Sequence, residues 1–272
     1  MKYLIMTDLE GVCGVDSFRQ TRTNDLEAKG PAMKQLARET NACIAGIRDV
    51  DPDAEVTVLD GHGSGGLFPE DIAGGVYCRY SSFDHDTLPS YRALFYVGQH
   101  AMEGTVDAPL RHTYSSRRVQ YYRLNGVNIG EFGSFSNWAG LNGVPVIFLA
   151  GDDKAALEAK MFVPNIETVA TKYGKGVEAA EHRPSDEVLR DIRAGAARAL
   201  RRIDEIKPLT TFQSPYVFEA RYYEPIDEEA WKARPNAEVI DSRTVRIYAD
   251  DYRDLPFFGK NAFKKKNMEA SQ

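Results

Sequence analysis

The chain has 272 residues, a formal net charge of −6 at pH 7, 43% hydrophobic residues and 27% charged residues. This composition is that of a globular protein long enough to bury a core without structural staples, and it excludes an intrinsically disordered chain. The acidic balance argues against a general nucleic-acid-binding protein, because such proteins carry a basic surface.

The distribution of apolar residues and cysteines bears on the compartment. The longest strongly apolar run covers residues 144–150, which is far too short to span a bilayer, so we expect no membrane partner. The apolar stretch at the N-terminus is too short for a secretory signal peptide. Three cysteines without CxxC spacing do not form a disulfide framework. These features predict a soluble, cytoplasmic protein.

Strand-like apolar runs alternate with helical patterns in the first hundred residues, which predicts an α/β fold. Residues 3–7 form a continuous apolar run, typical of a strand buried on both faces. Apolar side chains recur at helical spacing over residues 31–50, with Pro31 in the first turn. Further strands are predicted over residues 55–59, 74–80 and 93–97.

The rest of the chain continues this alternation. Residues 119–129 predict a hairpin, because Asn125-Gly126 favours a type I′ turn. Asp152 is a suitable N-cap for a helix over residues 154–161. The remaining predicted elements are helices over 133–141, 185 to about 206 and 227–233, strands over 144–150, 216–223 and 244–249, and a frayed basic tail at 264–266.

The chain is expected to divide near residue 185. We predict a catalytic α/β domain over residues 1–185 and a C-terminal helix-and-strand extension over residues 186–272, packed on it. No glycine- or serine-rich linker marks this boundary, so one continuous domain is the alternative.

Polar residues that can bind metals follow several predicted strands. Ligands of open α/β sheets bind beyond the carboxyl ends of the strands, so this placement predicts a site there. The residues are Asp8, Glu10, Asp60, His62, His100, Glu131, Asp152 and Asp153.

Asp8 and Glu10 are spaced so that both carboxylates leave an extended backbone on one face. Two carboxylates in a buried place repel each other unless a positive group joins them, and a metal ion is the simplest such group. The alternative is that Glu10 caps a turn before Gly11 and only Asp8 matters.

The chain has five histidines, and three of them, His62, His100 and His112, fall at or just after predicted strand ends. A lone histidine is more often a packing residue than a ligand. Two histidines converging with three carboxylates favour a metal site, and zinc with mixed nitrogen and oxygen ligands and an open position is typical of hydrolases. Two metals that share a carboxylate can activate one water.

Five short motifs follow one another along the chain: DLEGVCG at residues 8–14, DGH at 60–62, GQHA at 98–101, GEFG at 130–133 and the apolar strand with GDD at 146–153. Together and in this order they resemble the zinc D-aminopeptidases, a family also named dipeptide transport proteins. The resemblance covers most of the chain and is strongest up to about residue 160.

The resemblance implies a site with two zinc ions per chain. By the family pattern the ligands are Asp8, Glu10, His62, His100 and Glu131, with Asp8 bridging. His112 falls where the family has a non-ligand histidine of the active site, and we interpret it as a general acid/base, since metal-bound hydroxide already serves as nucleophile. The segment between His100 and His112 is one residue longer than expected. The oxyanion donor stays open among Arg111, Asn142 and backbone amides.

The resemblance also implies a fold and an assembly. The fold is a three-layer α/β/α sandwich around a mostly parallel mixed sheet, with a C-terminal α+β extension. Family members form closed homo-oligomeric rings, a decamer in the type case, which restricts substrates to short peptides. The implied activity is removal of an N-terminal D-amino acid such as D-Ala. Glu10 or another acidic residue would then bind the free amino group.

Two alternative functions remain. Residues 4–11 also resemble the first motif of haloacid-dehalogenase-like phosphatases, in which Asp8 would be a phosphorylated nucleophile, Glu10 the acid/base and Mg²⁺ the metal. Against this, Ala156 stands where an Asp is usual, and the histidines would have no role. The second alternative is a non-catalytic peptide-binding protein. An open site with an uncommitted His112 favours catalysis over binding alone.

Overall fold

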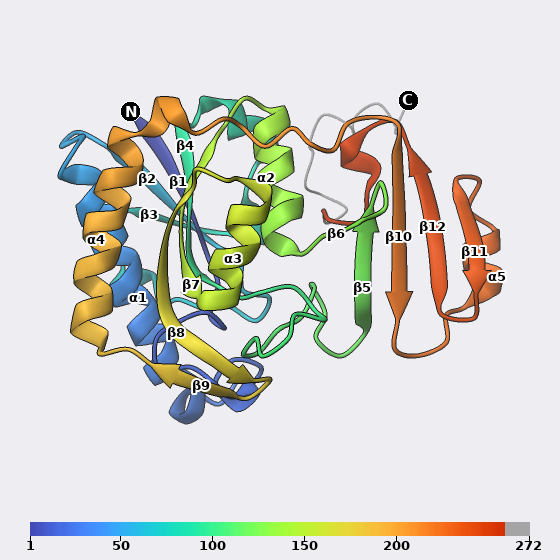
Figure 1. Ribbon diagram of the computed structural model, residues 1–272, viewed down its shortest axis with the longest axis horizontal. Coiled ribbons are helices and arrows are strands. Elements are labelled where there is room, and N and C mark those ends of the chain that lie inside the picture. Colours follow the sequence, from blue (N-terminus) through green and yellow to red (C-terminus); the bar gives the residue numbers. More distant parts are fainter. Residues whose placement is uncertain (259–272) are drawn as a thin grey trace.

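A central seven-stranded sheet organises the larger part of the protein in this computed structural model, which describes residues 1–258 (Figure 1). Along the sheet the strand order is β3-β2-β1-β4-β7-β8-β9, and β9 alone runs antiparallel to its neighbour. The strands are β1 (Lys2–Thr7), β2 (Glu55–Asp60), β3 (Val76–Arg79), β4 (Ala93–Gln99), β7 (Val146–Asp152), β8 (Glu167–Gly176) and β9 (Ala179–His182).

Helices cover both faces of this sheet, which confirms the predicted α/β fold. Helices α1 (Leu26–Arg48) and α4 (Ser185–Arg201) pack against each other on one face. Helices α2 (Glu131–Leu141) and α3 (Asp153–Phe162) lie on the other face (Figure 1). The central strands β1, β4 and β7 are buried almost throughout, as continuous apolar runs predict.

Helix α1 begins five residues before the predicted start. Its N-cap is Asp25, whose side chain accepts a hydrogen bond from the Glu27 backbone at 3.0 Å. Pro31 therefore lies inside the helix rather than in its first turn, where it removes one backbone donor.

A second, antiparallel sheet lies beside α2, with strand order β11-β12-β10-β5-β6 (Figure 1). The predicted hairpin is present, and its turn residues Asn125 and Gly126 have φ of 49° and 84°, as a type I′ turn requires. This sheet has its own core around Phe218. Its elements are β5 (Val119–Leu124), β6 (Val127–Asn128), β10 (Tyr216–Tyr222), α5 (Glu228–Lys232), β11 (Ala237–Asp241) and β12 (Thr244–Ala249).

A division at residue 185 does not separate these two sheets. Helix α4 follows residue 185, but it packs on α1 and β8 of the first sheet. Strand β5 precedes residue 185, but it pairs with β10 of the second sheet. The chain therefore enters the second sheet, returns to the first and enters the second again. Strands β8, β9 and β11 were not predicted, and α4 ends at Arg201, before residue 206. The basic tail at 264–266 lies outside the described residues.

Short 3-10 helices connect the larger elements within residues 1–258. They cover Phe18–Gln20, Pro69–Asp71, Tyr80–Ser82, His85–Ser90, Ile203–Glu205 and Tyr252–Asp254. None of the helices in this part of the chain is both long and apolar enough to cross a membrane.

Candidate metal centre

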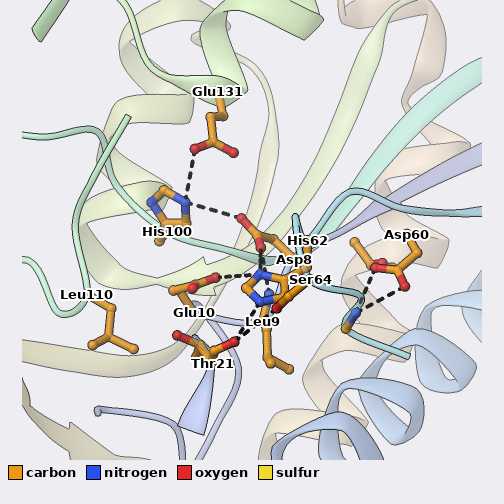
Figure 2. Close-up of polar contacts among 12 residues, drawn as sticks. Asp8, Leu9, Glu10, Thr21, Asp60, His62, Ser64, His100, Leu110 and Glu131 are labelled. Atoms are coloured by element: carbon orange, nitrogen blue, oxygen red, sulfur yellow. Dashed lines mark hydrogen bonds and ion pairs between the residues drawn. The ribbon is translucent and has the colours of Figure 1, made fainter. Parts of the chain in front are cut away.

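The predicted site residues meet beyond the carboxyl ends of three parallel strands (Figure 2). Asp8 and Glu10 follow β1, His62 follows β2, and His100 follows β4. Glu131 is the first residue of α2 and reaches the same place from the opposite side. Strand ends of a parallel sheet thus position the cluster, as expected for an α/β fold.

Two glycines allow the ends of β1 and β4 to approach closely. The backbone N–H of Gly11 donates to the carbonyl of Gly98 at 2.7 Å. A Cβ on Gly11 would lie 2.0 Å from the Gln99 carbonyl oxygen, and a Cβ on Gly98 would lie 1.9 Å from the Asp8 carbonyl oxygen. Gly98 also has a φ of 80°, a backbone conformation that is unfavourable for residues with a Cβ atom. These glycines therefore bring Asp8 beside His100.

Asp8 lies at the centre of the cluster. Its Oδ1 is 3.0 Å from His62 Nδ1, and its Oδ2 is 3.2 Å from His100 Nε2. Glu10 Oε2 lies 3.2 Å from the same His62 nitrogen, and Glu131 Oε1 lies 3.6 Å from the same His100 nitrogen. The two oxygens of Asp8 thus face two different histidines (Figure 2). His62 also faces Glu10, and His100 also faces Glu131.

Backbone carbonyls orient all three histidines. The Nε2 of His62 donates to the Thr21 carbonyl at 3.0 Å, and the Nδ1 of His100 donates to the Ala101 carbonyl at 2.9 Å. The Nδ1 of His112 donates to the Leu110 carbonyl at 3.0 Å. Such bonds fix the tautomer and leave the other ring nitrogen available to a metal or a proton.

His112 joins the cluster from the loop after β4. Its ring stacks on that of His100, with centroids 3.9 Å apart, and its Nε2 lies 3.6 Å from Glu131 Oε1. Within residues 1–258, two groups of side chains could hold a cation, Asp8 with Glu10 and His100, and His100 with His112 and Glu131. All six predicted site residues are therefore together.

The electrostatics of the cluster fit a cation. Burial opposes charge on His62, but Glu10 and Asp8 outweigh it and raise the pKa of His62 well above its ordinary value. Burial is likewise the largest effect on Glu10, yet His62 leads the groups that lower its pKa well below the ordinary range. Glu10 thus stays ionised because positive charge is held against it.

The donor atoms also fit a metal such as zinc. Glu10 Oε2 and His100 Nε2 are buried, and no hydrogen bond of good geometry satisfies either atom among the described residues. Imidazole nitrogens and carboxylate oxygens are common zinc ligands, and catalytic sites keep an open position. Both residues belong, with Asp8, to a group whose possible ligand atoms lie within 4.8 Å of one another, so the residues present are suitable for metal binding.

The cluster forms the floor of a cavity of about 460 Å³. Ser64 and the glycines around His62 line one side, and the loop of residues 114–117 lines another. An apolar part is lined by Met6, Tyr80, Tyr96, Phe135 and Phe257. This volume is in the range of small-ligand sites.

Other acidic residues at strand ends have structural roles instead. Both oxygens of Asp60 accept from the Gly66 backbone at 3.0 Å, away from the cluster (Figure 2). Asp152 caps α3 by accepting from Lys154 and Ala155, and Asp153 accepts from the Gly174 backbone. The prediction that these carboxylates join the metal-capable group is therefore wrong.

Two candidate oxyanion donors also lie elsewhere. Arg111 forms an ion pair with Glu103 at 3.3 Å, and the Asn142 side chain donates to the Trp138 carbonyl at 2.8 Å. Neither lines the cavity.

The remaining two histidines do not line the cavity. His85 was expected in a polar loop, but it is buried among aromatic rings that include Tyr80 and Phe83, and burial lowers its pKa to about 4. His182 accepts from the Gly14 backbone at 3.0 Å.

Several residues of the site were not predicted. Arg22 and Phe257 line the cavity from distant segments without any local motif. Lys172, on the unpredicted strand β8, is fully buried and donates to the backbone carbonyls of Glu10, Val12 and Val15. The role of Lys172 in supporting the loop after β1 could not be predicted, because no sequence motif surrounds this lysine.

Comparisons with known proteins identify relatives of this chain. A D-aminopeptidase of Bacillus subtilis (strain 168) is 30% identical over 263 residues, which cover 92% of this chain and 92% of that protein. The solved structure of the zinc-dependent D-aminopeptidase DppA from Bacillus subtilis, described as a self-compartmentalizing protease, superposes with a TM-score of 0.81 at 24% identity. It covers 100% of this chain and 97% of that one. At that identity the structural match supports the fold.

The peptidase family M55, described as D-aminopeptidase, matches residues 1–257, almost the whole described chain. This match supersedes both alternatives considered from the sequence, the phosphatase and the non-catalytic binding protein. The chain is a peptide-hydrolysing enzyme and belongs to the D-aminopeptidase family.

Proposed function

We propose that this protein is a dinuclear zinc aminopeptidase that removes the N-terminal residue from short peptides, with preference for a D-amino acid such as D-Ala. The position of Asp8 carries the proposal. Its two oxygens face His62 and His100, and Glu10 and Glu131 complete a nearly symmetrical pair of donor sets. The D-aminopeptidase names of the relatives support the substrate class.

Asp8 would bridge two zinc ions in this proposal. Glu10 and His62 complete one site, and His100 and Glu131 complete the other. When bound, zinc lowers the pKa of a coordinated water and polarises the scissile carbonyl, which is the chemistry that peptide hydrolysis needs.

His112 is the proposed general acid/base. Its Nδ1 proton is committed to the Leu110 carbonyl, so its Nε2 is free to take a proton from the attacking water and return it to the leaving amine. The stacked ring of His100 and the carboxylate of Glu131 hold the imidazole beside the cluster. An N-terminal ammonium group would be attracted by the carboxylates of the floor.

We further propose a closed homo-oligomeric ring, such as a decamer, in the cytoplasm. The self-compartmentalizing description of the structural relative supports the assembly. Exposed apolar side chains on α2 and α3, Leu141, Leu157 and Met161, suit subunit contacts. The three cysteines are unpaired, which suits a reducing compartment. Light scattering tests the ring, and a monomer at micromolar concentration would contradict it.

Metal content and hydrolysis on one sample test the function. Protein purified without chelator should contain close to two zinc ions per chain and release D-alanine from D-Ala-D-Ala faster than L-alanine from L-Ala-L-Ala. Chelation should abolish the activity, and added zinc should restore it. Protein that lacks zinc and remains inactive after zinc addition would overturn the proposal.

A further inference from the structure

Two arginines of the cavity wall have no acidic partner among residues 1–258. Arg22, in the turn after the first 3-10 helix, and Arg117, in the loop after His112, both belong to the cavity wall. In residues 1–258, neither guanidinium has a carboxylate within 4.0 Å. By contrast, Arg38, Arg111 and Arg123 each form such an ion pair.

Arg22 is held in place although it lacks an ion pair. Its guanidinium lies over the Phe18 ring, 3.1 Å from the centroid, and its Nε is buried without a hydrogen-bond partner. Burial and then the charge of Arg117 lower the pKa of Arg22, which places the two cations near each other. The charges of Glu10 and Glu178 act on Arg22 in the opposite direction, from beyond ion-pair distance.

The loop that carries Arg117 is tied to the metal centre. The Tyr114 backbone donates to Glu131 Oε1 at 2.6 Å, and the backbones of Arg118 and Val119 donate to the Ser115 carbonyl. Arg117 therefore projects from a loop whose position is coupled to a proposed zinc ligand.

We propose that Arg22 and Arg117 form a subsite for the C-terminal carboxylate of the peptide substrate. This inference rests on the proposed peptidase function and deepens it, because it selects dipeptides with a free C-terminus. Two positive charges in one cavity repel each other, and an anion bound between them offsets this repulsion. Guanidinium groups also match the planar geometry of a carboxylate.

Chain geometry links this subsite to substrate length. One extended residue spans at most about 3.3–3.6 Å, so the carboxylate of a dipeptide lies within about 4 Å of the scissile carbonyl. Arg22 and Arg117 line the same cavity as the carboxylates of the floor, so a carboxylate at that reach from the metal centre lies in the cavity that holds both arginines. A longer peptide places its carboxylate beyond the pair.

Kinetics with D-Ala-D-Ala and with its C-terminal amide test the subsite in the zinc-loaded protein. We expect the amide to have a KM at least about ten-fold higher. Arg22→Gln and Arg117→Gln should each raise the KM for D-Ala-D-Ala by about ten-fold while kcat changes little, and should leave the amide within two-fold. Arg22→Lys should recover part of the loss.

Arg118→Gln is the matched control, because it removes the same charge from the neighbouring position, which does not line the cavity. It should leave both substrates unchanged. Thermal melting of every variant checks folding. If the arginine variants impair both substrates equally, or impair neither, the subsite is overturned.

Calorimetric binding to the chelated, inactive protein gives a second readout that does not depend on turnover. D-Ala-D-Ala should bind at least about ten-fold more tightly than the amide, and Arg117→Gln should remove this difference. Carboxylate-dependent binding without hydrolysis by the zinc-loaded protein would leave the subsite standing and overturn the peptidase function. Hydrolysis of D-Ala-D-Ala and its amide with equal KM would support the peptidase function and overturn the subsite.

Discussion

Glu10 and Glu39 are two buried glutamates on either side of the loop after β1, and they have opposite electrostatics. Glu10 faces the histidine cluster. Burial is the largest single effect and raises its pKa, but His62, His112 and His100 together hold the pKa well below the ordinary value. Glu39 accepts from the Cys13 backbone and from Gln35, and burial raises its pKa to about 7. Burial alone therefore favours a neutral carboxyl, whereas positive partners keep the carboxyl ionised and able to bind a cation.

The substitution Asp8→Asn is the sharpest test of the histidine cluster that surrounds Glu10. The amide keeps only one oxygen and no charge, so residue 8 can no longer bridge the two proposed zinc sites. We expect zinc content to fall and activity to drop by more than the roughly 100-fold that loss of a supporting hydrogen bond costs. Elemental analysis and D-Ala-D-Ala hydrolysis measure both.

The control for Asp8→Asn is Asp53→Asn, the same change at an exposed position. It should retain zinc and activity. Full zinc occupancy in the Asp8→Asn variant would contradict the bridging role.

His112→Ala separates metal binding from proton transfer within the same cluster. As an acid/base, His112 should contribute about 10²–10⁴-fold to kcat, while the variant retains two zinc ions per chain. His182→Asn is the matched control and should be fully active, because His182 lies outside the cavity. Loss of one zinc from the His112 variant would instead identify this residue as a ligand.

Gly98→Ala tests the close contact that places Asp8 beside His100. The added Cβ would clash with the Asp8 carbonyl at a φ of 80°, so we expect a loss of about 3 kcal/mol in the free energy of unfolding. Gly143 has a φ of 77° with no atom within 4 Å of such a Cβ. Gly143→Ala should therefore cost only about 1 kcal/mol. Equal losses in urea unfolding would show that the clash is relieved.

The substitution Glu39→Gln tests the raised pKa of Glu39. Of the four predictions, it has the smallest expected effect, a change in how stability depends on pH. Since the pKa of Glu39 rises from 4.5 in the unfolded chain to about 7, the folded protein binds more protons between these values. Its contribution to stability is therefore present below pH 4.5 and is lost as the pH rises to about 7. At about 1.4 kcal/mol per pKa unit, the change is at most about 3 kcal/mol.

Urea unfolding from pH 4.5 to 8 checks this sign. The wild type should lose more stability over that range than Glu39→Gln, whose amide keeps an acceptor for the Cys13 backbone. Glu55→Gln is the control, because that side chain is 74% exposed. Parallel pH profiles for wild type and Glu39→Gln would contradict the raised pKa.

The floor of the cavity could be predicted from the sequence because each proposed ligand lies in a short motif that follows a strand or begins a helix. Asp8, His62 and His100 follow apolar runs that were identified correctly, and parallel strands bring such ends together. The same rule also selected Asp60 and Asp152 wrongly. Spacing does not distinguish a carboxylate that binds a metal from one that caps a helix or a loop.

The wall of the cavity could not be predicted, because Arg22 and Phe257 come from segments that meet only in the folded chain. The expected boundary near residue 185 does not separate the two sheets, for a related reason. Strands β5 and β10 form one sheet across a hundred residues, and their local patterns do not reveal the pairing. Local periodicity likewise missed β8, so the support that Lys172 gives to the loop after β1 was not predicted either.

Anomalous diffraction at the zinc edge, on crystals of the zinc-loaded protein, tests the central claim most directly. We predict two anomalous peaks in each chain, both bound by Asp8, with Glu10 and His62 on one and His100 and Glu131 on the other. His112 should remain unbound and hydrogen-bonded to the Leu110 carbonyl. A single peak, or a peak coordinated by His112, would contradict the proposed division between ligands and acid/base.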